Sequence, residues 1–506
     1  MEEKRFNYFL STAPLIAIVA IFAVFKPKEL ANAVVKVSGF LYDKLDFIIL
    51  PSAILAFIFC IFIALSKYGS IKLGGENAKK EYSNAQWLFL LVTAGVGVGI
   101  VFFAHEGYWH LRQSPYTLGT GTGGTGMGAD LKSNITTALG LAMVDWGVPP
   151  WSLYCLGGLV ISYFAYQKNG DFSISAPLVK AFPNSKFARF LSVAVLIFAI
   201  VAVSLSISSS ITMATTQVSA GVSNITGSSI SPFVILGIIF VLSLIVSIMP
   251  IAKARSWLGN VMIYLALFVL AFIFLFGDTH YYLQIIATNV GVAFNPSKLL
   301  EFGTNLFAIQ ERREWLTWYP IAYNIWWLAW LPFVGVFLAK ISRGRTIREF
   351  VFASIFIPSI LMLVWFTIIS GHVIKDFIIG SGELAAIADS ANYQNTMFAL
   401  LNQLPLAGFT KIILLALLFC AITSSVSSST IALGIMTSKN GKTESPYLAA
   451  LWCILMTLIS IAVLISGDVQ GIKAFGSIGG LPFLFVSIIL AYVLLRQLIR
   501  DKGAVK

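Results

Sequence analysis

The chain has 506 residues, of which 58% are hydrophobic and 11% are charged, and its net charge is +12. Since a soluble domain carries roughly 25% charged residues, this composition excludes an ordinary soluble protein and indicates a chain that lies in a lipid bilayer. Most of its Lys and Arg residues fall in alternate loops, which follows the positive-inside rule with both termini cytoplasmic and argues against a nucleic-acid partner.

Apolar segments recur from end to end of the chain, separated by short polar breaks. Each is close to the length of about 20 residues that crosses the hydrocarbon core. The first segment lacks a following small-residue cleavage site, so we expect it to be a retained span. The sequence therefore predicts an all-α integral membrane protein with about twelve transmembrane helices. The predicted spans are residues 9–25, 47–66, 86–109, 134–166, 187–212, 230–250, 256–277, 319–340, 350–371, 408–435, 446–467 and 476–497.

The third span contains the stretch LLVTAGVGVGIVFF, with glycines at 95, 97 and 99. Each Gly weakens a helix by about 1 kcal/mol relative to Ala, so the backbone can unwind here and offer free carbonyls to a cation. Close helix packing is an equally good explanation of the glycines. Towards the outer end of this span we expect His105 and Glu106 to be solvated in an entry vestibule.

The Gly- and Thr-rich segment 114–133 lacks the Lys-Ser/Thr ending of a phosphate loop, and we expect a flexible external loop. In the fourth span, DWGVPPWSLY supplies three aromatic side chains around a Pro-Pro pair. Burying the carboxylate of the preceding Asp145 inside a span is costly, so we expect it to have an interaction partner or a functional role. It could balance a cationic substrate, take up a proton, or pair structurally, for example with Lys132.

Residues 278–318 mix apolar and charged residues at helical spacing, which predicts an amphipathic helix along the outer surface. The eighth span then begins with YNIWWLAW. Tryptophans at span ends usually form an interfacial belt, which is our interpretation of Trp87, Trp109 and Trp318. The tryptophans within the fourth and eighth spans lie too deep for that. Aromatic faces there would bind a quaternary ammonium group by cation–π attraction, about 0.5 to 2 kcal/mol per face.

Two further stretches are polar. The inner loop ISRGRTIREF (341–350) is basic, either to orient the chain or to couple and gate a pathway. In the tenth span, CAITSSVSSST (420–430) is rich in hydroxyls, which commonly bond to helix backbone but also suit Na⁺. The four histidines are scattered in sequence, which argues against the His/acid cluster of a membrane enzyme, and the aromatic constrictions argue against a channel.

The segment WWLAWLPFVGVFLAKISRGRTIRE resembles the signature of the betaine/choline/carnitine transporter family, and DWGVPPWSLY and AGVGVG resemble two further segments of it, in the same order and spacing. This resemblance implies two inverted five-helix repeats, a leucine-transporter-like fold, preceded by two extra helices. The implied division is 1–85 for the tail and two peripheral helices, 86–277 for the first repeat, 278–318 for the external helix, 319–497 for the second repeat and 498–506 for a cytoplasmic tail.

The family resemblance also implies a site. Trp146, Trp151, Tyr154 and Trp327 would form an ammonium cage, with Trp326 on the same pathway. The exit route would contain Trp330, with gates at Phe333 and Phe337. The implied sodium site has the backbone carbonyls of Thr93, Val96 and Cys420 and the hydroxyls of Thr423 and Ser424. A second sodium site in VAVSLSISSS (201–210) is not assigned.

Two local features favour sodium as the coupling ion, with no other cofactor. Proton-coupled choline carriers of the family have Asp where this chain has Gly99, and sodium-independent exchangers have Arg where it has Met262. Asn324 stands where many members have another Trp, and Asp145 where His is common. The expected function is secondary active transport of a quaternary ammonium compound of the glycine betaine, choline or carnitine type, by sodium symport with alternating access in the bacterial cytoplasmic (inner) membrane. Sodium-independent exchange and proton-coupled choline transport are the alternatives, and a channel is the alternative from a different class. The resemblance also implies a homotrimer.

Overall fold

The structure is a computed structural model that describes residues 8–93, 97–118, 131–249, 252–304, 313–438, 445–466 and 469–503. Within these ranges the secondary structure is helical, apart from an isolated bridge between Lys72 and Thr346. The expected all-α fold class is therefore confirmed for the part of the chain that is described.

The first half of the chain forms the helices α1 (Tyr8–Phe25), α2 (Pro27–Leu65), α3 (Asn84–Thr93), α4 (Gly99–Phe102), α5 (Glu106–Gln113), α6 (Pro115–Leu118), α7 (Leu131–Trp146), α8 (Val148–Gln167), α9 (Ala176–Ala181), α10 (Lys186–Thr226), α11 (Pro232–Ile248) and α12 (Ala252–Phe276). The second half forms α13 (Thr279–Ala293), α14 (Pro296–Thr304), α15 (Arg313–Leu316), the π-helical turn η1 (Thr317–Ile321), α16 (Ala322–Ile341), α17 (Ile347–Ile379), α18 (Glu383–Ala388), the 3-10 turn η2 (Tyr393–Asn395), α19 (Thr396–Asn402), α20 (Ala407–Thr437), α21 (Pro446–Ser466), α22 (Val469–Ile478) and α23 (Leu481–Gly503).

In the described ranges, 9 helices or runs of adjoining helices are long and apolar enough to cross a membrane, and Thr12–Phe25 and Pro232–Ile248 form shorter apolar helices. Large apolar side chains such as Phe47, Phe187 and Phe190 are exposed on the outer surface, as expected for contact with lipid. The protein is thus an integral membrane protein. The twelve-helix arrangement of two inverted repeats stays a prediction.

Several predicted spans are broken helices. The third is divided among α3, α4 and α5, with residues 94–96 outside the described part. The fourth is divided at Gly147, where an added Cβ would lie 2.5 Å from the carbonyl oxygen of Met143. The last begins after Gly480, whose added Cβ would lie 2.0 Å from the carbonyl oxygen of Ile325. Only a residue without a side chain allows these close backbone approaches.

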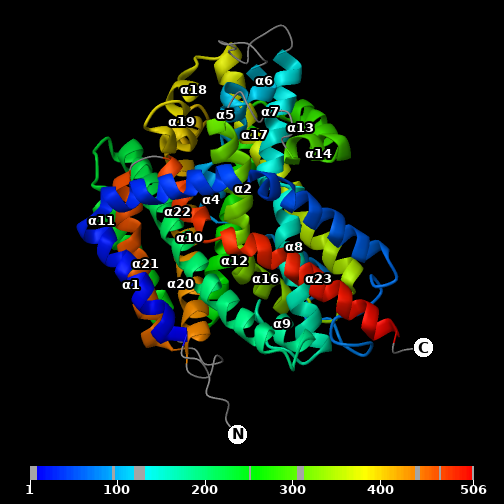
Figure 1. The fold of residues 1–506 in the computed structure, drawn as a ribbon. Coiled ribbons are helices and arrows are strands. Elements are labelled where there is room, and N and C mark those ends of the chain that lie inside the picture. The colour runs from blue at the N-terminus through cyan, green and yellow to red at the C-terminus, as the bar shows by residue number, and fades with distance from the viewer. Residues whose placement is uncertain are drawn as a thin grey trace.

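The helix α16 lies near the middle of the molecule and packs against α8, α22 and α10 (Figure 1). In the same view α5, α6, α18 and α19 lie at the upper end and α9 lies at the lower end. The central position of α16 explains why Trp326 and Trp327 are buried and Trp330 is partly buried.

Two expectations about helix boundaries are corrected. The second span, expected at 47–66, is the end of a much longer helix, because α2 begins at Pro27 and includes polar residues that a hydropathy pattern excludes. The single amphipathic helix expected over 278–318 is instead divided: α13 and α14 are separated at Asn295, and α15 and η1 follow from Arg313, beyond residues 305–312, which lie outside the described part. Most of the Gly- and Thr-rich segment, residues 119–130, lies outside the described residues.

Candidate functional site

A cavity of about 460 Å³ lies between the broken helix α3–α4 and the middle of α16. Its described lining is aromatic, apolar or neutral polar, and contains no acidic or basic side chain. The lining residues include Tyr82, Gly97, Gly99, Trp146, Tyr154, Met262, Tyr323, Trp326, Trp327, Trp330, Phe333, Phe337, Ile341, Ser424, Ser425 and Ser428.

The aromatic residues predicted for the site largely meet here. Trp146, Tyr154, Trp326, Trp327 and Trp330 line the cavity, as do the predicted gates Phe333 and Phe337. Tyr323, which the sequence did not single out, also lines it, although it opens the YNIWWLAW stretch.

Trp151 does not line the cavity. It is fully buried behind two lining rings, with centroids 5.6 Å from Tyr154 and 5.9 Å from Trp327. Its position indicates that it supports the wall, whereas the family resemblance implied direct contact with substrate.

The lining rings also contact one another. Tyr154 and Trp327 have centroids 4.8 Å apart at an interplanar angle of 60°, and Trp146 and Trp327 lie 5.8 Å apart at 81°. Cation–π contact places a cation within about 6 Å of a ring centroid. An ammonium group would therefore meet the cavity-facing side of this aromatic cluster, because Tyr154 and Trp327 leave no room between them.

Two glycines make space for the indoles. An added Cβ on Gly99 would lie 3.1 Å from Cη2 of Trp146, and one on Gly476 would lie 2.6 Å from Cε2 of Trp326. The glycine repeat of the third span therefore has a packing role at Gly99, in addition to the break between α3 and α4.

The hydroxyl-rich segment of α20 lies beside that break. An added Cβ on Gly97 would lie 4.0 Å from Oγ of Ser425, and Ser424 lines the cavity. Thr423 is buried and Cys420 is half-buried. Val96 lies outside the described residues, and Thr93 is described only as the last residue of α3. The sodium site therefore stays a prediction, although the two segments it needs are neighbours.

The Ser-rich stretch of α10 is mainly structural. Ser206 donates a hydrogen bond of 2.6 Å to the carbonyl of Gly476, and Ser209 donates one of 2.6 Å to the carbonyl of Ile472. These bonds fix α10 to α22.

The two residues at which the chain departs from the family have partners. Asn324 donates from Nδ2 to the carbonyl of Ile49 at 3.3 Å, so it joins α16 to α2 and does not line the cavity. Asp145 is buried, with Oδ2 3.2 Å from Nε2 of His110. Lys132, the partner considered for it, is exposed near the opposite end of α7.

Asp145 belongs to a group of buried ionisable residues that we call the polar cluster: Glu106, His110, Asp145 and Lys473. Side-chain atoms of the first three lie within 4.8 Å of one another. The expectation of a solvated His105 and Glu106 is wrong, since both are buried. The premise that scattered histidines form no cluster with acidic residues is also wrong, because folding brings α5 and α7 together. The sequence analysis did not single out Lys473, although it is the only charged residue in the otherwise apolar or neutral stretch IKAFGSIGG.

The polar cluster is joined to the cavity wall. Nε1 of Trp146 donates to Oε2 of Glu106, and Nε1 of Trp327 donates to the backbone carbonyl of Asp145 at 2.9 Å. Two indoles thus present their rings to the cavity and their N–H groups to the cluster, which satisfies the buried donors.

The belt interpretation of three tryptophans is corrected, because all three are buried in protein. Trp87 donates to Oγ of Ser342 at 3.1 Å, and Trp109 donates to the carbonyl of Ala388 at 3.0 Å. Trp318 packs edge-on against Tyr42, with centroids 6.3 Å apart.

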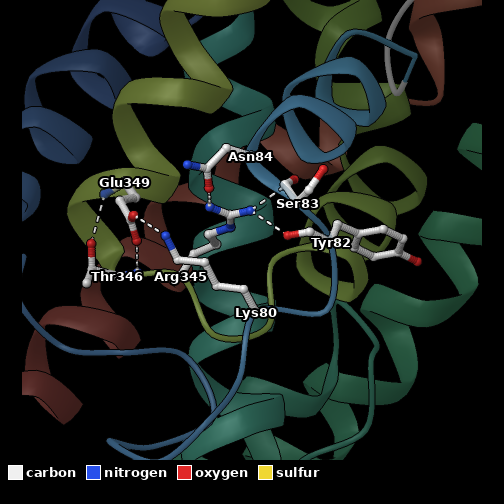
Figure 2. Close-up of polar contacts among 7 residues, drawn as sticks. All are labelled: Lys80, Tyr82, Ser83, Asn84, Arg345, Thr346 and Glu349. Carbon is white, nitrogen blue, oxygen red and sulfur yellow. Dashed lines mark hydrogen bonds and ion pairs between the residues drawn. The ribbon is translucent and has the colours of Figure 1, made fainter.

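The basic loop between α16 and α17 is hydrogen-bonded through Arg345 to the start of α3 (Figure 2). Arg345 is buried and donates to Oδ1 of Asn84 and to the carbonyls of Tyr82 at 2.8 Å and Ser83 at 3.3 Å. Its guanidinium also lies 4.3 Å from the ring centroid of Trp87. Burial lowers the pKa of Arg345, and the carboxylate of Glu349 opposes this shift.

The same loop is closed by a capping box and an ion pair. Thr346 Oγ1 accepts from the backbone N–H of Glu349, whose carboxylate accepts from the N–H of Thr346. The second oxygen of Glu349 pairs with Lys80 at 2.9 Å, also drawn in Figure 2. The loop therefore links α17 to the chain before α3, which positive charge alone would not require.

A membrane-embedded helical protein with a neutral aromatic cavity beside a broken helix belongs to the class of small-molecule transporters by its architecture. Sequence comparison identifies the family: residues 7–503 match the betaine/carnitine/choline family transporters (BCCT), and the chain belongs to this family. The family assignment made from the three motifs is thereby confirmed, and an enzymatic role is not expected.

Two of the relatives below match this chain over nearly their full length, and the third is longer. The chain is 29% identical to the probable glycine betaine transporter of Desulfitobacterium hafniense, over 99% of both chains. It is 26% identical to an ectoine/hydroxyectoine transporter of Virgibacillus pantothenticus, over 100% of this chain and 99% of that one. It is 29% identical to a high-affinity choline transport protein of Escherichia coli, over 86% of this chain and 64% of that one.

Proposed function

We propose that the protein carries a quaternary ammonium compound of the glycine betaine, choline or carnitine type across the cytoplasmic membrane by sodium-coupled alternating access. The observation that carries this proposal is the cavity itself. Its described lining combines seven Trp and Tyr rings with no charged side chain. A trimethylammonium group has no N–H donors, so ring faces can hold it without a buried carboxylate.

The shape of the cavity supports alternating access. It reaches from Trp146 along α16 to Ile341 and to Tyr82, beside the loops that the charge pattern assigns to the cytoplasm. On the opposite side, Phe103 and Tyr319 each contact Trp109, with centroid separations of 6.4 Å. This arrangement is that expected of an inward-facing state, in which packed rings close the outer side.

Sodium coupling is supported by chemistry and proximity. Na⁺ prefers several oxygen ligands, and the hydroxyls of Thr423 and Ser424 lie on the helix that approaches the α3–α4 break. Binding there would stabilise the bent conformation that shapes one wall of the cavity. Coupling then follows if sodium binds the outward-open state more tightly than the other states.

The decisive experiment is uptake of labelled glycine betaine, choline, carnitine and ectoine into proteoliposomes, with and without an inward sodium gradient. We expect saturable uptake of at least one of them that depends on sodium. Saturable uptake without sodium would instead favour the exchanger or proton-coupled alternative. Linear flux that ignores all gradients would favour a channel.

A matched pair of variants tests the sodium ligands. We expect Ser424→Ala to raise the sodium concentration needed for half-maximal uptake, because one ligand is lost. Ser428→Ala removes a hydroxyl that also lines the cavity but is outside the predicted sodium set, so it should leave that concentration unchanged. Equal effects of the two variants would contradict the assignment.

The family implies two further properties, both proposals. We expect a homotrimer, which the mass of the purified complex would test. We also expect both termini in the cytoplasm of a bacterial cell, which labelling of single cysteines in intact cells would test. A monomeric mass, or labelling of a terminal cysteine by an impermeant reagent, would contradict these expectations.

A further inference from the structure

The polar cluster holds an unequal number of charges. Glu106 and Asp145 bring two carboxylates, and Lys473 brings one ammonium group that interacts electrostatically with both. Nζ of Lys473 donates to the carbonyl of Trp318 at 2.7 Å and lies 3.6 Å from the ring centroid of Tyr319. The ammonium group is therefore held in place within electrostatic range of both carboxylates.

His110 does not supply the missing positive charge. Its Nδ1 accepts a hydrogen bond of 3.3 Å from Nε1 of Trp315, so Nδ1 carries no proton. The single ring proton then lies on Nε2, which is 3.2 Å from Oδ2 of Asp145. With a neutral His110, the cluster has one negative charge in excess.

The excess charge is buried and incompletely satisfied. Glu106 and His110 are fully buried, and Oε1 of Glu106 has no hydrogen-bond partner among the described residues. A buried carboxylate without full compensation is unfavourable. One bound proton would neutralise the cluster and give Glu106 or Asp145 an O–H donor.

Other ionisable side chains around the cluster do not remove this imbalance. Asp389, further out, accepts from the hydroxyl of Tyr108 and lies 3.8 Å from Arg112. Glu314 of α15 interacts electrostatically with Tyr319 but is exposed and accepts a hydrogen bond from Gln470. The buried groups His105, before α5, Tyr108 of α5, Tyr319 of η1 and Tyr323 of α16 bring no charge when His105 is neutral.

The cavity lies directly on the other side of two indoles. Trp146 faces the cavity with its ring and bonds to Glu106 with its N–H, while Trp327 bonds in the same way to the backbone of Asp145. A cation bound to these rings would be separated from the excess negative charge of the polar cluster by a single indole. Its positive charge would then compensate the excess charge, so the cluster would no longer need the bound proton.

We propose that the polar cluster binds one exchangeable proton in competition with a net-cationic substrate in the aromatic cavity. This inference rests on the proposed function, because it needs an onium ligand there. It distinguishes among ligands: choline is a net cation, whereas glycine betaine brings its own carboxylate. Across about 8 Å at an effective dielectric constant of about 20, the competition amounts to a roughly 30-fold change in affinity for a full charge.

The test is calorimetric binding of choline and glycine betaine to the purified full-length protein in a lipid nanodisc. Titrations in buffers of different ionisation enthalpy, between about pH 5 and 9, report the protons exchanged. We expect choline to release protons and to bind up to roughly 30-fold more tightly as pH rises. Glycine betaine should release fewer protons. Choline binding without proton release, or equal release by both ligands, would overturn the proposal.

Variants of the two carboxylates test whether the exchangeable proton is bound by the polar cluster. Asp145→Asn and Glu106→Gln keep side-chain shape and remove one carboxylate each, so either should reduce proton release and flatten the pH dependence. Glu301→Gln is the control, because this carboxylate lies on α14 and pairs with Lys298. Release that persists in the double variant would exclude the cluster. If choline, glycine betaine and carnitine all fail to bind the wild-type protein at any pH, the proposed function itself is contradicted.

Discussion

The hydrogen bonds from Arg345 to the start of α3 predict that this side chain stabilises α3 against local opening. Arg345→Ala removes three hydrogen bonds, to Asn84 and to the carbonyls of Tyr82 and Ser83. It also removes the contact with the ring of Trp87. The start of α3 would then lose its main connection to the loop between α16 and α17.

The size of the effect follows from these contacts. A hydrogen bond contributes about 1 kcal/mol, and more when the donor is charged. Three of them therefore give about 3 kcal/mol, without the ring contact. If the start of α3 opens locally, its opening equilibrium should increase by roughly 100-fold.

Hydrogen–deuterium exchange of the peptide covering residues 84–92 measures this opening. Arg343→Ala is the matched control, because Arg343 lies in the same loop, carries the same charge and is exposed. We expect fast exchange in Arg345→Ala and wild-type exchange in Arg343→Ala. If both variants exchange alike, the loop acts through its charge alone and the reasoning is refuted.

Two further predictions use positions whose surroundings are fully described. Gly476→Ala should displace Trp326 and weaken substrate binding, at a cost of about 1 to 3 kcal/mol for overpacking. Gly237→Ala is the control, because no atom lies within 4 Å of its added Cβ, and this variant should bind substrate normally. Equal substrate binding by the two variants would contradict the packing argument. The Lys375 hydrogen bond lowers the pKa of Asp278, the N-cap of α13, below its ordinary 3.8, so its contribution to stability is present above that value and lost as pH falls through the lowered pKa. The melting temperatures of wild type and Asp278→Ala should converge in acid, and a constant difference would show that the charge of Asp278 is irrelevant.

The membrane character of the chain was predictable because hydropathy is a local property. Runs such as 408–435 have to be helical in lipid, and α20 (Ala407–Thr437) follows closely. The breaks were less predictable. Gly147 and Gly480 are identified by close contacts with Met143 and Ile325, and the second of these partners is distant in sequence.

The site was predictable where a motif placed rings on one stretch of chain, as for Trp326, Trp327 and Trp330. Trp151 shows where prediction from the sequence fails. It lies on the same helix as Tyr154, but only the packing of α8 against α16 determines which of the two rings lines the cavity. The polar cluster needed α5, α7 and α22 to meet, so no local pattern joins His110 to Asp145 or Lys473.

The central claim is that ring faces in the cavity hold the onium group of the substrate. Equilibrium binding of labelled choline or glycine betaine to Trp327→Phe and Trp327→Leu tests it most directly, because both variants lose the bond to the carbonyl of Asp145 and differ only in keeping an aromatic face. The account predicts that Trp327→Phe binds several-fold to about tenfold more tightly than Trp327→Leu. Equal affinities for the two variants would contradict it.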